Sequence, residues 1–181
     1  MNPAQDEALA RLLTTLEVVH RAAVQLAYSW RRMVAEPIDR VWVEALQQRP
    51  ELAERVEAFA SRYGRMQDTL SEKLLPRWLS ALAERPASLI ENLNRAERLG
   101  VLASVEHWLE ARKLRNRLVH EYLTDAAAFA ADLRLALEYT GMLLATYNRL
   151  RADVADRLGC DPARLPPAIE LPAGDIHSTD R

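Results

Sequence analysis

Apolar side chains recur at steps of three and four residues along much of this chain, and this spacing constrains the fold more than any other feature. In the first helix predicted, over residues 4–35, the recurring positions are Leu9, Leu12, Leu13, Leu16, Val19, Ala23, Leu26 and Trp30. Such steps place apolar side chains on one face of an α-helix. The 181 residues include only five glycines, and the apolar content is mainly Leu and Ala, which favours helices over strands.

Prolines divide the next part of the chain. Pro37 is expected to end the first helix and to open a short second one, because proline fixes its own φ angle and has no backbone donor. Pro50 is expected to start a third helix that reaches Leu75. Pro76 then predicts a kink, after which the helix continues to about residue 84.

Capping residues mark the later helices. Ser88 and Glu91 have the spacing of a capping box, and Gly100 suits the position just after a helix end. Ser104 and Asp125 are expected to cap two further helices, because their side chains can accept hydrogen bonds from the first free N–H groups. The predicted spans of these two helices are 105–122 and 126 to about 158.

These elements predict a single all-α domain, an antiparallel bundle of four to six helices over residues 1–160. Residues 161–181 contain four prolines and little periodicity. We expect them to form a disordered or loosely docked tail.

Charge and composition exclude several classes of protein. The net charge is −2, so any contact with nucleic acid must come from a local cluster of cations. Cys160 is the single cysteine, which excludes a disulfide framework, and the histidines lack metal-ligand spacing, so we expect neither a metal site nor a cofactor. No stretch resembles a signal peptide or a membrane span, and we expect a cytoplasmic protein with no membrane partner.

The most concentrated basic segment covers residues 112–122 and carries Arg112, Lys113, Arg115 and Arg117. On a helix, Lys113, Asn116, Arg117 and His120 share one face. A neighbouring stripe consists of Trp108, Ala111, Arg115, Leu118 and Tyr122. An arginine within an apolar stripe is costly unless it meets an anion or lines a cleft. The alternative for the whole segment is a solvated basic face with no function.

These residue types suit cleavage of a phosphodiester bond without a metal. A histidine side chain such as that of His120 can remove or donate a proton near neutral pH. Arg115 can hold phosphate oxygens with its planar fork and stabilise the charge that builds on them, and Asn116 can orient the histidine. Arg112, Lys113 and Arg117 would attract RNA electrostatically.

The string Arg115-Asn116-x-x-x-His120-x-Tyr122 resembles the R-x4-H signature of HEPN domains, in the extended form found in HepT-like toxins. Similar segments lie upstream at residues 62–68, 73–76 and 93–100, and the likeness covers roughly residues 5–158. The resemblance implies a helical homodimer with two motifs facing each other across a cleft, acting as a metal-independent endoribonuclease. It also implies a nucleotidyltransferase antitoxin that attaches AMP to Tyr122.

The geometry of an α-helix gives an argument for a dimer that does not depend on the resemblance. Positions five apart, such as Arg115 and His120, differ by about 140° around a regular helix. Either the helix is distorted between them, or residues from two chains build each site across a twofold axis. We expect the second arrangement.

Other interpretations remain open. The main alternative to a nuclease is a helical binding partner of a nucleotidyltransferase that presents a substrate without cleaving it, and a third is an inert interaction bundle. Arg62, Arg65 and Asp68 could lie behind the site, although a set of salt bridges within one helix is the favoured interpretation. The four tryptophans are expected to anchor the core or an interface.

Overall fold

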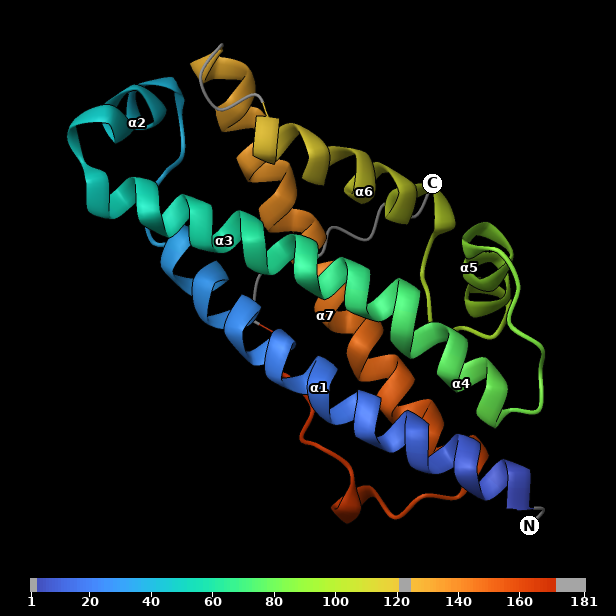
Figure 1. Ribbon diagram of the computed structural model, residues 1–181. Coiled ribbons are helices and arrows are strands. Elements are labelled where there is room, and N and C mark those ends of the chain that lie inside the picture. The colour runs from blue at the N-terminus through green and yellow to red at the C-terminus, as the bar shows by residue number, and fades with distance from the viewer. Residues whose placement is uncertain (1–2, 121–124, 172–181) are drawn as a thin grey trace, which may run out of the picture.

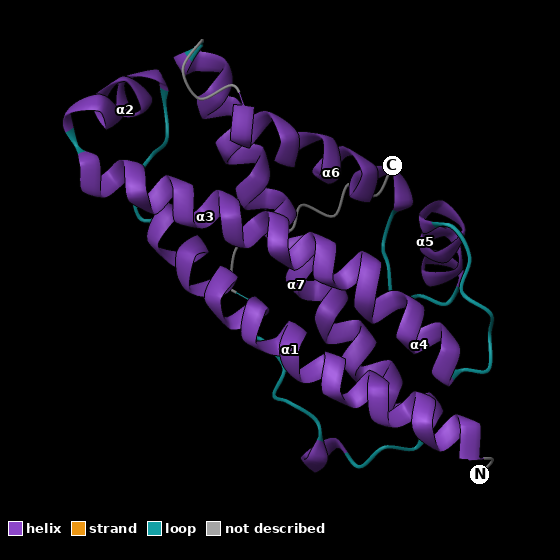
Figure 2. Ribbon diagram, viewed as in Figure 1, coloured by secondary structure: helices purple, strands orange, loops and turns teal. Residues whose placement is uncertain are grey.

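The computed structural model describes residues 3–120 and 125–171, and every regular element in these ranges is helical (Figure 1, Figure 2). The predicted all-α bundle is therefore confirmed. The α-helices are α1 (Pro3–Met33), α2 (Arg40–Glu44), α3 (Pro50–Thr69), α4 (Leu75–Ala81), α5 (Leu89–Arg98), α6 (Val105–His120) and α7 (Ala126–Leu158). Because α3 and α4 form one continuous rod, the described residues hold six helical rods, within the four to six predicted.

Three long rods form the frame of the bundle. Helix α1 packs along both α3 and α4, and α7 lies against α1 on the other side of the core (Figure 1). Helix α6 packs on α3 and on the first part of α7, while α5 lies against α4 and α6. The segment that carries the predicted site, α6, is therefore held by two helices of the frame.

The core contains the side chains that the sequence pattern predicts. On α1, Leu12, Leu16 and Val19 are completely buried, whereas Leu9 and Leu13 at the edge of the stripe are half-buried. Trp78 and Trp108 are fully buried, which confirms them as core anchors.

The predicted helix caps are present. The Ser88 hydroxyl accepts a hydrogen bond from the Glu91 backbone, and the Glu91 carboxylate accepts one from the Ser88 backbone, which completes the capping box. The Asp125 carboxylate accepts from two backbone N–H groups of α7, and Ser104 accepts from the backbone of His107. Gly100 adopts a φ of 81°, the left-handed conformation that glycine tolerates best after a helix end.

The sequence predicted a kink at Pro76, and the structure has a π turn over Leu70–Leu74 just before that proline. The Leu75 N–H donates to the Leu70 carbonyl, five residues back, where a regular helix would use a carbonyl four residues back. Helix α4 then ends at Ala81, earlier than the predicted residue 84, and Ala83 has a left-handed φ of 60° that ends the helical path.

The first part of the tail is docked, which is the second of the two alternatives expected for residues 161–181 and corrects the first one there. Residues 161–171 pack against α7, where Leu165 and Ile169 are buried. The Asn148 side chain makes two hydrogen bonds with the backbone of Ile169, at 2.9 and 2.8 Å. These contacts anchor an irregular segment that has no helical period of its own. Residues 172–181 lie outside the described residues.

Within the described ranges, none of the helices combines the length and the apolar character needed to cross a membrane.

Candidate functional site

The apolar stripe of α6 faces the core as predicted, with an arginine in its middle. Trp108 and Ala111 are completely buried and Leu118 is nearly so. Arg115 lies in the same stripe and its side chain is 33% exposed. Both conditions that make such a cation tolerable are met, because Arg115 contacts an acidic side chain and also lines a groove.

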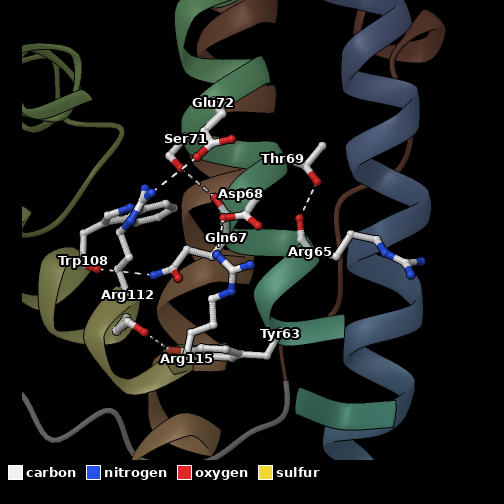
Figure 3. A network of polar contacts seen from close by, with 11 residues as sticks. Tyr63, Arg65, Gln67, Asp68, Thr69, Ser71, Glu72, Trp108, Arg112 and Arg115 are labelled. Carbon is white, nitrogen blue, oxygen red and sulfur yellow. Dashed lines mark hydrogen bonds and ion pairs between the residues drawn. The ribbon is translucent and has the colours of Figure 1, made fainter. Parts of the chain in front are cut away.

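The acidic partner of Arg115 is Asp68 on α3. The Arg115 Nη1 donates to the Asp68 Oδ1 at 2.8 Å (Figure 3). Since about a third of each side chain is exposed to solvent, the pair adds little to the stability of the fold. Its main effect is to orient the guanidinium group, which has five N–H donors in a fixed plane.

This pairing corrects the favoured interpretation of Arg62, Arg65 and Asp68. No salt bridge links these three residues within the described part of α3. Asp68 instead reaches α6, while Arg62 donates to the Ser29 hydroxyl on α1. The less favoured interpretation, in which this run lies behind the site, stays a prediction, and for Asp68 the contact with Arg115 supports it.

Gly64 allows Arg115 to lie against α3. A Cβ atom built on Gly64 would be 2.9 Å from the Arg115 Nε, closer than real Cβ atoms approach a neighbour. Gly64 is one helical turn before Asp68, so the two positions together accommodate the length of the arginine side chain. Gly64 belongs to the 62–68 segment, and no pattern in the sequence indicated this role for it.

Two buried polar side chains of α3 also fasten the backbone of α6. The Tyr63 hydroxyl donates to the Ala111 carbonyl at 3.3 Å, and the Gln67 amide donates to the Trp108 carbonyl at the same distance (Figure 3). Burial raises the pKa of Tyr63 far above its ordinary value, so this hydroxyl remains a neutral donor. These contacts hold α6 at a fixed position along α3 in addition to its apolar packing.

Arg112 and Arg117 are both paired with carboxylates. Arg117 donates to Asp132 on α7 through Nε and Nη2, at 2.9 and 2.8 Å, in a bidentate ion pair. The Arg112 Nη2 lies 3.4 Å from the Glu72 carboxylate in the π turn. Pairing reduces the positive field that these arginines present, and the Arg117 pair also ties α6 to α7. Their predicted contact with RNA stays a prediction.

Lys113 and Asn116 are exposed on the outer face of α6. Helix α6 continues without interruption to His120, so the backbone of His120 belongs to it. The side chain of His120 and the whole of Tyr122 lie outside the described residues. The structure therefore brings together Arg115 and Asp68, and leaves the other predicted roles as predictions.

A groove of about 480 Å³ lies beside Arg115. Its apolar wall is formed by α3, the last part of α6 and the start of α7, through Val56, Ala60, Leu118 and Phe129. Polar side chains of α3 and Arg115 form its rim. A second groove, of about 520 Å³, lies near the start of α1 and contains none of the predicted site residues. In the described residues, no group of His, Cys, Asp or Glu has an arrangement that could hold a metal ion.

Comparisons of this chain with protein-family models, with curated proteins and with solved structures found no match. The resemblance to HepT-like HEPN domains accordingly depends on the motif at Arg115–Tyr122 and its upstream segments. The structure itself shows a helical bundle in which Arg115 lines a groove and contacts Asp68.

Proposed function

We propose that this protein is a homodimeric, metal-independent endoribonuclease that acts in the cytoplasm as the toxin of a toxin–antitoxin pair. The observation that carries the proposal is the placement of Arg115. Its guanidinium group lines an open groove, is oriented by Asp68, and belongs to the same helix as His120. An oriented arginine at an accessible surface can bind a phosphate with two parallel hydrogen bonds.

In the proposed reaction, His120 removes the proton of a ribose 2′-hydroxyl, whose oxygen attacks the adjacent phosphorus. The bond to the 5′ oxygen of the next nucleotide breaks, that oxygen takes up a proton, and a 2′,3′-cyclic phosphate remains. Arg115 holds the non-bridging oxygens and stabilises their charge in the transition state, while Asn116 orients His120. Lys113, Arg112 and Arg117 contribute to the attraction of RNA. Tyr122 lines the site and accepts AMP from a nucleotidyltransferase antitoxin.

The decisive experiment is cleavage of RNA by purified protein in excess EDTA. Mass spectrometry first establishes that Tyr122 is unmodified. We expect the wild type to cleave and to leave 2′,3′-cyclic phosphate ends. The His120→Ala variant, purified in parallel, controls for contaminating ribonuclease and is expected to be inactive. If the unmodified dimer binds RNA but leaves it intact, the alternative function of a non-catalytic partner of a nucleotidyltransferase replaces this proposal.

The dimer has its own support in the geometry of α6. Helix α6 is continuous from Val105 to His120, so the backbone positions of Arg115 and His120 differ by about 140° around its axis. A continuous helix supports a site that combines Arg115 of one chain with His120 of another.

Mixing two inactive variants tests this arrangement. Chains carrying Arg115→Ala and chains carrying His120→Ala are unfolded together and refolded, so that half of the dimers contain one chain of each kind. In these mixed dimers one of the two composite sites is intact, and we expect about a quarter of the wild-type activity to return. If both residues of each site came from one chain, every site would lack a residue and the mixture would stay inactive.

Gly64→Ala tests the approach of Arg115 to α3. The new methyl group meets the Arg115 side chain and moves it from its position beside Asp68. A displaced catalytic group costs about tenfold or more in rate. Alanine is a better helix former than glycine by about 1 kcal/mol, so the free energy of unfolding is expected to stay within about 1 kcal/mol of the wild type.

Gly141→Ala is the matched control. Gly141 also lies within a helix, but a Cβ there would meet only Trp30, at an ordinary 3.9 Å. We expect unchanged cleavage and equal or greater stability by thermal unfolding. Equal activity of the two variants would show that the position of Arg115 is irrelevant to the reaction.

A further inference from the structure

The groove beside Arg115 has walls of two different kinds. Along α3, Val56, Ala60 and Gly64 follow one another at four-residue steps and form part of the apolar side of the groove. Glu57, Ser61 and Arg65 follow at the same steps, one position further, and form its polar rim. An apolar surface bordered by hydrogen-bonding groups is the combination that a nucleobase requires.

The size and the charges of the groove agree with such an occupant. Its volume of about 480 Å³ is within the range of small-molecule sites and exceeds what a single base needs. Arg115 reaches into the groove from α6 and places a cation at its opening. A base in the groove would place its own phosphate near this cation, and the guanidinium plane of Arg115 offers a surface for stacking.

Among the described residues that line the groove, Glu57 is the one with an acidic side chain. A carboxylate accepts hydrogen bonds and donates none when ionised. Among the four RNA bases, guanine presents two adjacent donors, N1–H and the N2 amino group, which match the two oxygens of a carboxylate. Uracil presents a single N–H between two carbonyl groups, and these would face the carboxylate unfavourably.

We propose that this groove binds one base of the RNA, next to the phosphate held at Arg115, and that Glu57 makes guanine the preferred base. The proposal rests on the proposed function and adds to it a base-binding site on the walls of α3, α6 and α7. Glu57 would be a specificity-determining residue that takes no part in the chemistry.

The test measures binding without cleavage. Fluorescence anisotropy follows the full-length dimer as it binds labelled five-nucleotide 2′-O-methyl RNAs, which lack the attacking hydroxyl. One probe contains only uracil and the other carries a single central guanine. A bidentate contact to a base discriminates by about 1–3 kcal/mol, so we expect the guanine probe to bind about tenfold more tightly. With Glu57→Gln this preference is expected to fall to about twofold or less.

Two further variants test whether the preference for the guanine probe comes from the groove. Glu54→Gln removes the same charge from an exposed position on α3 outside the groove, and it should leave the preference unchanged. Ala60→Leu fills part of the groove and should reduce the affinity for the guanine probe to that for the uracil probe. Thermal unfolding checks that this variant is folded, and because Glu57 is exposed, its variant remains informative if Ala60→Leu is not folded.

The outcomes distinguish this inference from the proposed function. Equal binding of both probes by a protein that still cleaves RNA would overturn the base-binding site and leave the nuclease intact. An altered oligomeric mass in Ala60→Leu, without a change in the relative affinities for the two probes, would overturn it in favour of a second copy of this chain as the occupant. Failure to bind either probe, together with failure to cleave RNA, would reject the proposed function itself.

Discussion

Arg115→Ala is expected to lower the rate of RNA cleavage by about 10²–10³-fold, as the loss of one oriented donor to a charged transition state does in other enzymes. The reason is that Arg115 is fixed in place before any substrate binds, by Asp68 at 2.8 Å and by its approach to Gly64. Steady-state kinetics on a defined RNA measures the effect, which should fall mainly on kcat. The fold should remain, because both members of the ion pair are partly exposed.

Two companion variants make this prediction specific. Arg112→Ala removes an arginine one turn earlier on α6, whose partner is Glu72, and it is expected to cost less than about tenfold because it weakens attraction alone. Arg115→Lys keeps the charge and loses the planar fork, so most of the loss should persist. If Arg115→Ala and Arg112→Ala had equal effects, Arg115 would be one more surface cation.

Trp78→Ala is expected to have the largest effect on stability, a loss of about 3–5 kcal/mol in the free energy of unfolding. The Trp78 ring is completely buried, and its Nε1 donates to the Asp153 carboxylate on α7 at 2.7 Å. Removing the side chain opens a large cavity and also takes a hydrogen bond from a carboxylate that is mostly buried. For a chain of this size the melting temperature should fall by roughly 10 °C.

Trp78→Phe separates the two contributions. Phenylalanine keeps much of the apolar volume and loses the N–H group, so the loss should be about 1–2 kcal/mol by urea or thermal unfolding. Asp153 retains its ion pair with Arg157 at 2.6 Å, which limits the cost of the missing donor. A Trp78→Ala protein as stable as the wild type would mean that α4 does not depend on this contact with α7.

Local features of the fold were predictable because their causes are local. Ser88 and Glu91 are three residues apart, and Asp125 directly precedes the helix that it caps, so the hydrogen bonds follow from the spacing. The apolar stripe of α1 likewise depends only on the period of the helix. Such features need no knowledge of what lies elsewhere in the chain.

Contacts between residues far apart in the chain could not be predicted from the sequence. Asp68 and Arg115 are 47 positions apart, and the rules for a single helix favoured salt bridges within α3 instead. The packing of residues 161–171 depends on Asn148, whose side-chain amide makes hydrogen bonds with the backbone of an irregular segment. The spacing of apolar residues gives no sign of such hydrogen bonds. For the candidate site, the sequence predicted that Arg115 needs an anion or a cleft, but could not identify Asp68 or the groove.

The π turn at Leu70–Leu74 also has a consequence for how this chain can be compared with others. It accommodates one residue more than a regular turn, so the side chains after it are rotated by one position relative to those before it. Consider a homologue whose helix is uninterrupted here. If its positions are aligned with Tyr63–Asp68, before the turn, its positions around Trp78, after the turn, would be offset by one residue, and the reverse would also hold. An alignment across this helix therefore needs a single-residue gap within Leu70–Leu74 to keep both sides in register.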